Sequence, residues 1–183
     1  MSNFPEKKIF EEADNWIKNN KKVSLATVVQ TWGSSPLGIG SRMIVSEDGN
    51  FLGSVSGGCV ESFVFGKALE VIKHNKVETL EFGVTNSKAW EVGLTCGGKI
   101  KVFLEKISHK NLDFVKKIND TYTKNEIMVI ATRLNDGQRD IFDNTEANKS
   151  KAKFKIDFDT IKSGIRLLED QEWFLKVFQS NAK

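Results

Sequence analysis

Apolar residues at the start of the chain recur at helical intervals, at Ile9, Phe10, Ala13, Trp16 and Ile17. With Pro5 at a position that suits a helix start, this spacing predicts an amphipathic helix over residues 5–19. The pattern then changes to a continuous run of apolar and β-branched residues over 22–32. Such a run is typical of a buried strand.

The middle of the chain alternates between extended and helical patterns. Residues 42–57 predict a β-hairpin, because an Asp-Gly pair at 48–49 supplies the turn. Residues 59–74 are apolar on much of a helical surface and predict a mostly buried helix. We expect strands at 77–84 and at 99–107, and in the second of these apolar residues alternate with charged ones.

The last third of the chain is less distinctive. We expect a helix at 111–124, a strand at 126–134, a returning strand at 136–143, a polar connector at 144–155 and a partly helical segment at 158–179. Because helices and strands interleave irregularly, the predicted class is α/β or α+β, a single domain with a mixed β-sheet flanked by helices.

Charge and composition exclude several classes of protein. The 183 residues favour one domain, and the net charge of +3, from 27 basic and 24 acidic residues, is too small to indicate a nucleic-acid partner. No apolar run approaches the roughly 18 residues of a membrane span, and the first residues do not resemble a signal peptide. The two cysteines indicate free thiols in a reducing cytoplasm. His74 and His109 lie in polar surroundings, so we expect neither a His-based metal site nor a Ser–His–Asp triad.

Three glycine-bearing loops, at 33–40, 56–61 and 95–98, are the candidates for a functional site. The elements that flank them are expected to bring them to one end of a sheet, where glycine lets the backbone approach a ligand closely. Each of the two cysteines, Cys59 and Cys96, lies beside a pair of glycines. These two elements are either the two walls of one site or ordinary packing features.

The glycine pair Gly57 and Gly58 leads directly into the helix predicted to begin at Cys59. The free N–H groups of a helix N-terminus form an anion site suited to phosphate. A cysteine in that position has its thiolate stabilised. Glu61, in the first turn, either complements the helix dipole or acts as a proton acceptor near Cys59. Each residue alone has a structural explanation, so the functional signal lies in their combination.

Four ordered motifs resemble the N-terminal domain of the xanthine dehydrogenase accessory (XdhC/CoxI) family. They are G-S-x-P-x-x-x-G-x-x-M at 33–43, D-G at 48–49, G-G-C-x-E at 57–61 and C-G-G at 96–98. The region that resembles the family extends over residues 23–107 and keeps the family's order.

The resemblance implies an accessory protein for molybdenum hydroxylases of the xanthine or carbon monoxide dehydrogenase type. Such proteins bind the molybdenum cofactor as cargo, as molybdopterin or its cytidine dinucleotide, and aid its sulfuration and insertion. The implied partners are the hydroxylase apo-enzyme and a cysteine desulfurase. The implied role is that of a cytoplasmic maturation chaperone more than that of an enzyme.

The resemblance also implies a domain organisation. Residues 1–107 are the cofactor-binding core, and residues 108–183 are a C-terminal extension of the same domain. Longer family members continue with a Rossmann-like domain, which would begin about where this chain ends. A second copy of the chain and a separate Rossmann-like subunit are therefore further candidate partners.

The motifs single out a set of candidate site residues. Cys59 is the candidate sulfur carrier or molybdenum ligand, and with Glu61 it is the candidate catalytic residue. Arg42 taken alone is a surface cation. The full set of candidate cofactor-binding residues is Gly33, Ser34, Pro36, Gly40, Arg42, Gly57, Gly58, Cys59, Cys96, Gly97 and Gly98.

Three other functions remain open. A thiol-dependent enzyme would use Cys59 as its nucleophile, with Glu61 as the local candidate base. An interaction subunit would use the glycine loops to hold a partner chain. A redox switch would pair Cys59 with Cys96, which requires their Cα atoms to lie within about 7 Å. Near the C-terminus, an aromatic group forms a docking face or packs on this domain: Trp173, Phe174 and Phe178.

Overall fold

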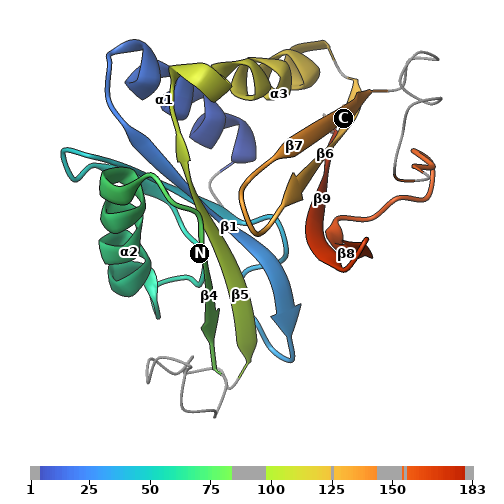
Figure 1. The fold of residues 1–183 in the computed structure, drawn as a ribbon, viewed down its shortest axis with the longest axis horizontal. Helices are drawn as coiled ribbons and strands as arrows, with labels where there is room; N and C mark the ends of the chain where they lie inside the picture. The colour runs from blue at the N-terminus through green and yellow to red at the C-terminus, as the bar shows by residue number, and fades with distance from the viewer. Residues whose placement is uncertain (1–4, 84–97, 125, 144–153, 155, 180–183) are drawn as a thin grey trace.

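Two antiparallel sheets and three α-helices make up the part of the chain that the structure describes (Figure 1). The computed structural model describes residues 5–83, 98–124, 126–143, 154 and 156–179. The single-domain α+β class predicted from the sequence is confirmed. The predicted mixed sheet is replaced by two sheets in which every described pairing is antiparallel. Hairpins and reversing connections, which antiparallel pairing permits, join most neighbouring strands.

The first sheet has five strands in the order β3-β2-β1-β5-β4. Strand β1 lies at its centre and pairs with both β2 and β5. The predicted hairpin around the Asp-Gly turn is confirmed as β2 and β3. The strands are β1 (Val23–Trp32), β2 (Arg42–Ser46), β3 (Phe51–Gly53), β4 (Glu78–Phe82) and β5 (Lys99–Ile107).

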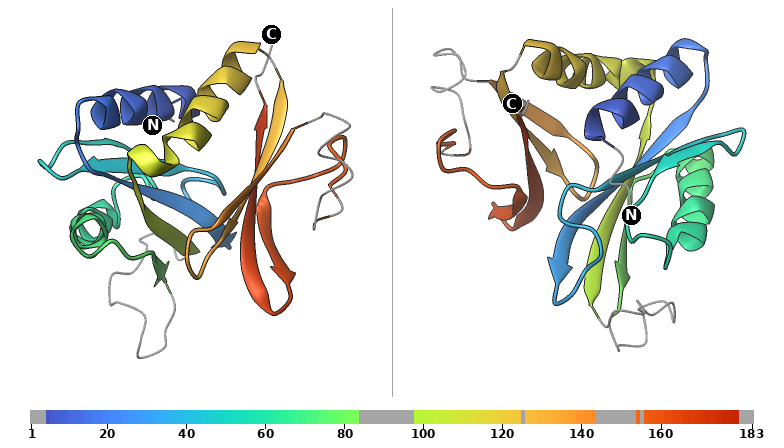
Figure 2. Two further views of the ribbon diagram at one scale, coloured as in Figure 1. Left: turned by 45° about the horizontal axis from the view of Figure 1, so that its top comes forward. Right: turned by 180° about the vertical axis from the view of Figure 1, so that it is seen from behind.

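The second sheet has four strands in the order β7-β6-β9-β8. It consists of β6 (Ile127–Arg133), β7 (Arg139–Asp143), β8 (Gly164–Leu168) and β9 (Gln171–Gln179). Figure 2 shows this sheet standing beside the first at a steep angle. At one end of the junction, Lys101 of β5 pairs with Glu172 of β9 at 2.8 Å.

Three helices cover the first sheet from opposite sides. Helices α1 (Glu6–Lys18) and α3 (Leu112–Lys124) pack on each other along one side, with the short 3-10 helix η1 (His109–Asn111) before α3. Helix α2 (Glu61–His74) lies on the opposite face of this sheet (Figure 1). The three predicted helical segments before residue 125 are therefore confirmed.

Strand β1 is buried on both faces, which explains its continuous apolar run. Leu25 points into the core formed with α1, α3 and the second sheet. Ala26 and Val28 point into the core under α2. A strand covered on both faces has no solvent side that would require alternating polar residues.

The prediction of partly helical structure at 158–179 is wrong. This segment forms the hairpin β8–β9, whose turn residues Glu169 and Asp170 have φ of +50° and +60°. Strand β9 places Trp173 in the outer core of the second sheet and Phe174 in the core between the sheets. A strand with apolar residues on both faces lacks period-two alternation and is easily read as a buried helix.

The aromatic residues of β9 do not form a docking face. Trp173, Phe174 and Phe178 are 2%, 3% and 1% exposed, so they pack on this domain. Phe178 makes edge-on ring contacts with Phe10 of α1 and Tyr122 of α3. These contacts join the C-terminal strand to both helices.

Candidate functional site

The Cys59 loop, residues 54–60 between β3 and α2, is organised around the carboxylate of Glu61. Gly57 and Gly58 have φ of +77° and +119°, a conformation that glycine adopts at no steric cost and that turns backbone amides inward. Both carboxylate oxygens accept hydrogen bonds from this loop. The donors are N–H of Val55 (3.1 Å), Ser56 (2.8 Å), Gly57 (3.1 Å), Gly58 (2.8 Å) and Val60 (3.2 Å), and the hydroxyls of Ser56 (2.6 Å) and Ser54.

Helix α2 begins at Glu61, two residues later than predicted. Its N-cap, Val60, has no side-chain oxygen, so the amides before the helix bond to the carboxylate of Glu61 instead. Cys59 therefore lies in the loop and not in the helix. It is half-buried against the apolar core between α2 and the first sheet.

The ionisation of Glu61 is shifted strongly by this loop. Burial opposes its charge, but hydrogen bonds from Ser54 and Ser56 outweigh burial and hold its pKa at about 2. At neutral pH the group is a carboxylate with its acceptor sites occupied. It is therefore poorly suited to act as a proton acceptor for Cys59.

The depressed pKa of Glu61 predicts a specific loss of stability in acid. The folded-state value of about 2 lies below the ordinary 4.5, so the stabilisation is present above pH 4.5 and disappears as pH falls towards 2. Because Glu61 is only half-buried, solvent screening reduces the total to about 1–2 kcal/mol, and Glu61→Gln should lack this part of the pH dependence. Urea unfolding of both proteins between pH 6 and 2.5 measures it. Parallel pH profiles would contradict the prediction.

The loop at 33–40 meets the start of β5 through backbone contact. Gly33, with φ of +67°, lies against the Cα of Gly98. A Cβ at Gly98 would overlap the carbonyl oxygen of Ser34, and one at Gly83 would overlap the carbonyl oxygen of Gly98. Glycine is therefore required where these segments cross. The structure thus brings Gly33, Ser34 and Gly98 together.

The two loops lie at the same end of the first sheet. Figure 1 shows the start of α2 and the ends of β1 and β4 in the lower part of the view. Phe63 of α2 makes an edge-on contact with Phe82 of β4, with ring centroids 5.7 Å apart, and Gly83 follows directly. Side-chain packing thus links the helix that carries Glu61 to the strand end beside Gly98. Cys96 and Gly97 lie outside the described residues.

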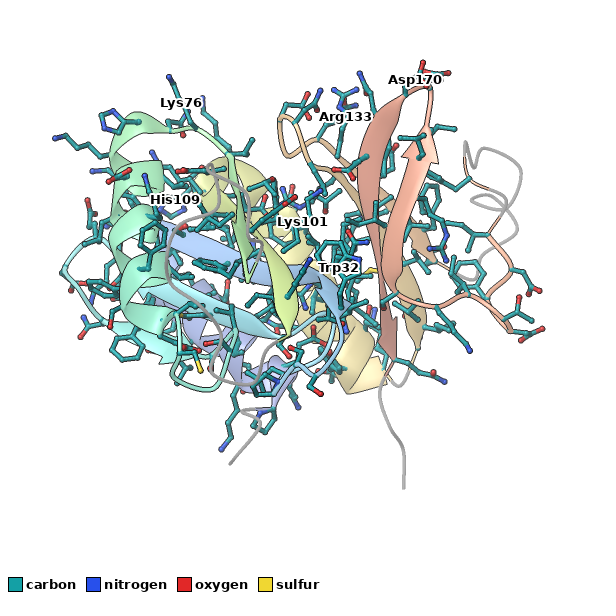
Figure 3. All side chains as sticks on the ribbon, turned by 90° about the horizontal axis from the view of Figure 1, so that it is seen from below. Trp32, Lys76, Lys101, His109, Arg133 and Asp170 are labelled. Carbon is teal, nitrogen blue, oxygen red and sulfur yellow. The ribbon has the colours of Figure 1, made fainter. Side chains whose placement is uncertain are left out.

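Sequence reasoning missed three residues that shape this end of the molecule. Ser54 and Ser56 bind the Glu61 carboxylate, and the S-x-S-G-G spacing before Cys59 is the signal that marks them. Trp32 is the last residue of β1 and is 40% exposed. Figure 3 shows it near the junction of the two sheets.

The carbonyl of Arg42 accepts the N–H of Ser54 at 2.9 Å, but its side chain is not brought to these loops and is not a surface cation. It is 6% exposed and lies on the face of β2 opposite α2, where it pairs with Glu6. Its guanidinium lies 5.0 Å and 5.1 Å from the ring centroids of Phe10 and Phe178. Burial lowers the pKa of Arg42 to about 10, so it remains charged at neutral pH.

The other members of the 33–40 motif have different surroundings. Gly40, with φ of +92°, is buried at the base of the loop, donates its N–H to the carbonyl of Val28 at 2.8 Å and lies against the side chain of Lys176. Pro36 is exposed at the tip. Within the described ranges, no group of three or more His, Cys, Asp or Glu side chains is placed to hold a metal ion. In the same part of the chain, no helix is long and apolar enough to cross a membrane.

Comparison with known proteins shows which family the segment that carries this site matches. Residues 16–83, which include β1, the 33–40 loop, the Cys59 loop and α2, match the model of the XdhC and CoxI family. The family predicted from the motifs is thereby confirmed over that segment.

Particular relatives make the relationship more specific. The chain is 34% identical over 91 residues to the molybdenum cofactor insertion chaperone PaoD of Escherichia coli (strain K12), a match that covers 50% of this chain and 28% of that protein. It is 29% identical over 110 residues to a probable xanthine dehydrogenase subunit of Bacillus subtilis (strain 168), covering 58% of this chain and 33% of that one. The match therefore spans a third or less of these relatives.

A solved structure has the same fold over most of the chain. The crystal structure of a xanthine dehydrogenase from Bacillus halodurans superposes with a TM-score of 0.65 at 21% identity, covering 93% of this chain and 52% of that one. Both sheets are therefore part of a known architecture.

Proposed function

We propose that this chain is an accessory protein that binds the molybdenum cofactor as cargo and aids its insertion into a molybdenum hydroxylase apo-enzyme. The observation that carries the proposal is the Cys59 loop, fixed by Glu61 inside the segment that matches the family. A relative named as a molybdenum cofactor insertion chaperone matches half of the chain.

The residues at this end of the sheet fit the chemistry of that cargo. Molybdenum and a dithiolene are soft, and the Cys59 thiolate is a suitable soft ligand. Gly33 is exposed and lies against the buried Gly98, so a ligand could approach the backbone of the 33–40 loop closely at Gly33. The exposed ring of Trp32 offers a flat apolar face of the kind on which a pterin stacks.

We assign Cys59 the role of a ligand to the cargo in preference to that of a sulfur carrier. Its side chain is half-buried against the core under α2, which limits access for the thiol of a second protein. In this proposal, the cysteine desulfurase sulfurates the cofactor while this chain holds it. A second copy of the chain and a separate Rossmann-like subunit remain candidate partners.

A thiol-dependent enzyme is less well supported. Its local candidate base is Glu61, whose carboxylate accepts hydrogen bonds throughout the loop and has a pKa of about 2. His74 ends α2, at the opposite end of the helix from the Cys59 loop. Glu61 is therefore a weak base, and His74 lies too far from the thiol to accept its proton.

Delivery of the cofactor tests the proposed function. Wild type and Cys59→Ala are loaded with molybdenum cofactor and mixed with a xanthine dehydrogenase apo-enzyme, whose recovered activity is measured. We expect Cys59→Ala to activate at least about tenfold less, because one metal–thiolate contact worth about 1.4 kcal/mol or more is lost. Ser62→Ala, an exposed change on the first turn of α2, is the matched control. Equal activation by Cys59→Ala would refute the role of the thiol.

A further inference from the structure

We propose that Glu61 is a positioning residue, an anion supplied by the chain itself that fixes the Cys59 loop and fills the place a phosphate would take. The purpose of the loop rests on the proposed function. The positioning role rests on the geometry of the described residues alone. This role differs from the two that the sequence suggested for Glu61, which were to complement the helix dipole and to accept a proton near Cys59.

The hydrogen bonds of Glu61 converge from one side. Five backbone N–H groups and two hydroxyls of the Cys59 loop reach its two oxygens. A carboxylate offers about four lone-pair positions, so this set saturates it. No acceptor capacity is left for a substrate proton or a metal ion.

The loop conformation depends on that single charge. Positive φ at Gly57 and Gly58 turns successive amides towards one point, which forms a concave anion-binding nest. Without an anion, these converging N–H dipoles would repel one another and several donors would lose their partner. Ser54 and Ser56 strengthen the arrangement, since each hydroxyl accepts a backbone N–H bond while donating to Glu61.

Because the Glu61 carboxylate occupies the nest, the loop amides are not available to bind the cargo. A phosphate at Gly57 and Gly58 would have to displace a half-buried, hydrogen-bonded carboxylate that is also negatively charged. The backbone donors of this loop therefore hold Cys59 in place and do not bind the cargo's phosphate. Selectivity at this end comes from the thiol and from the exposed backbone at Gly33.

Chemical rescue tests the positioning role in the apo protein. Wild type, Glu61→Ala and the control Glu70→Ala, an exposed residue of α2 paired with Lys67 at 2.9 Å, are compared with and without sodium formate. Two readouts are taken: hydrogen exchange of the 54–60 amides, and iodoacetamide alkylation of the Cys59 peptide by mass spectrometry across pH 6–9. Glu61→Gln, which keeps the side-chain shape, is measured in parallel in case the alanine variant does not fold.

Glu61→Ala should exchange its loop amides at least about tenfold faster than wild type and show an altered Cys59 alkylation profile. Formate, and equally inorganic phosphate, should restore both properties towards those of wild type, whereas Glu70→Ala should match wild type throughout. Unchanged exchange and alkylation in Glu61→Ala would overturn the proposal, and so would a change that neither anion reverses. Protection of the wild-type loop by phosphate would show that the nest is open to ligands and would also overturn it.

This outcome is distinguishable from failure of the proposed function. Both readouts use the apo protein and involve no molybdenum cofactor. If anion rescue succeeds but cofactor delivery does not depend on Cys59, the positioning role stands and the cargo assignment falls. If delivery depends on Cys59 but anion rescue fails, the cargo assignment stands and the positioning role of Glu61 falls.

Discussion

Replacing Gly98 with alanine is expected to destabilise the protein by about 3 kcal/mol or more, one of the largest effects of any single methyl group in this fold. The added Cβ would overlap the backbone carbonyl of Ser34, and backbone atoms cannot turn aside as a flexible side chain can. The start of β5 and the 33–40 loop would have to separate. Chemical denaturation of the variant and wild type measures the loss of unfolding free energy.

Gly38→Ala is the matched control for this experiment. It lies in the 33–40 loop that Gly98 contacts and adds the same methyl group, but no atom lies within 4 Å of the new Cβ. The two variants therefore differ in steric surroundings and not in chemistry. Equal stability of Gly98→Ala and Gly38→Ala would contradict the close crossing of the two segments.

The second large effect is expected from Arg42→Met. This change removes the cation that pairs with Glu6 between α1 and β2 and leaves Glu6 with the hydroxyl of Tyr122 and with Lys176 at 3.5 Å. Arg42 is buried and Glu6 is half-buried, so losing this ion pair and the packing of the guanidinium on Phe10 and Phe178 should cost about 2–3 kcal/mol. Urea denaturation at pH 7 measures this cost.

A double variant separates the charge effect from the loss of packing. The double variant Arg42→Met/Glu6→Gln should be destabilised by less than the sum of the two single variants, because the ion pair between them is lost only once. Lys22→Met, which removes an exposed cation paired with Glu47, should change stability by less than about 1 kcal/mol. A simple sum of the two single effects would show that Arg42 and Glu6 do not interact. In both Arg42→Met and the double variant, Cys59 alkylation should be unchanged, because the side chain of Arg42 lies on the face of β2 opposite α2.

Most elements of the first sheet could be predicted because each carries a local signal. The helical spacing from Ile9 to Ile17 and the Asp-Gly turn at 48–49 specify α1 and the β2–β3 hairpin without reference to the rest of the chain. The second sheet is harder to predict, since β9 is buried on both faces by segments distant in sequence. Its long apolar run therefore matches a helix and a strand equally well.

The site shows the same division between local and long-range information. The glycines at 57 and 58 and their closeness to Cys59 can be read from the sequence. The reach of Glu61 back over the loop follows from hydrogen bonds that composition does not reveal. Arg42 is misread as a surface cation because its partner, Glu6, lies on a different element. An arginine is usually exposed, but the ion pair with Glu6 allows Arg42 to be buried.

Anaerobic purification of wild type and Cys59→Ala from a molybdate-fed host, with metal analysis and oxidised-pterin fluorescence, tests directly whether this chain carries the molybdenum cofactor at the Cys59 loop, as we propose. We expect molybdenum and pterin bound to wild type and strongly reduced in the variant. Wild type that holds neither, even after addition of free cofactor, would contradict it.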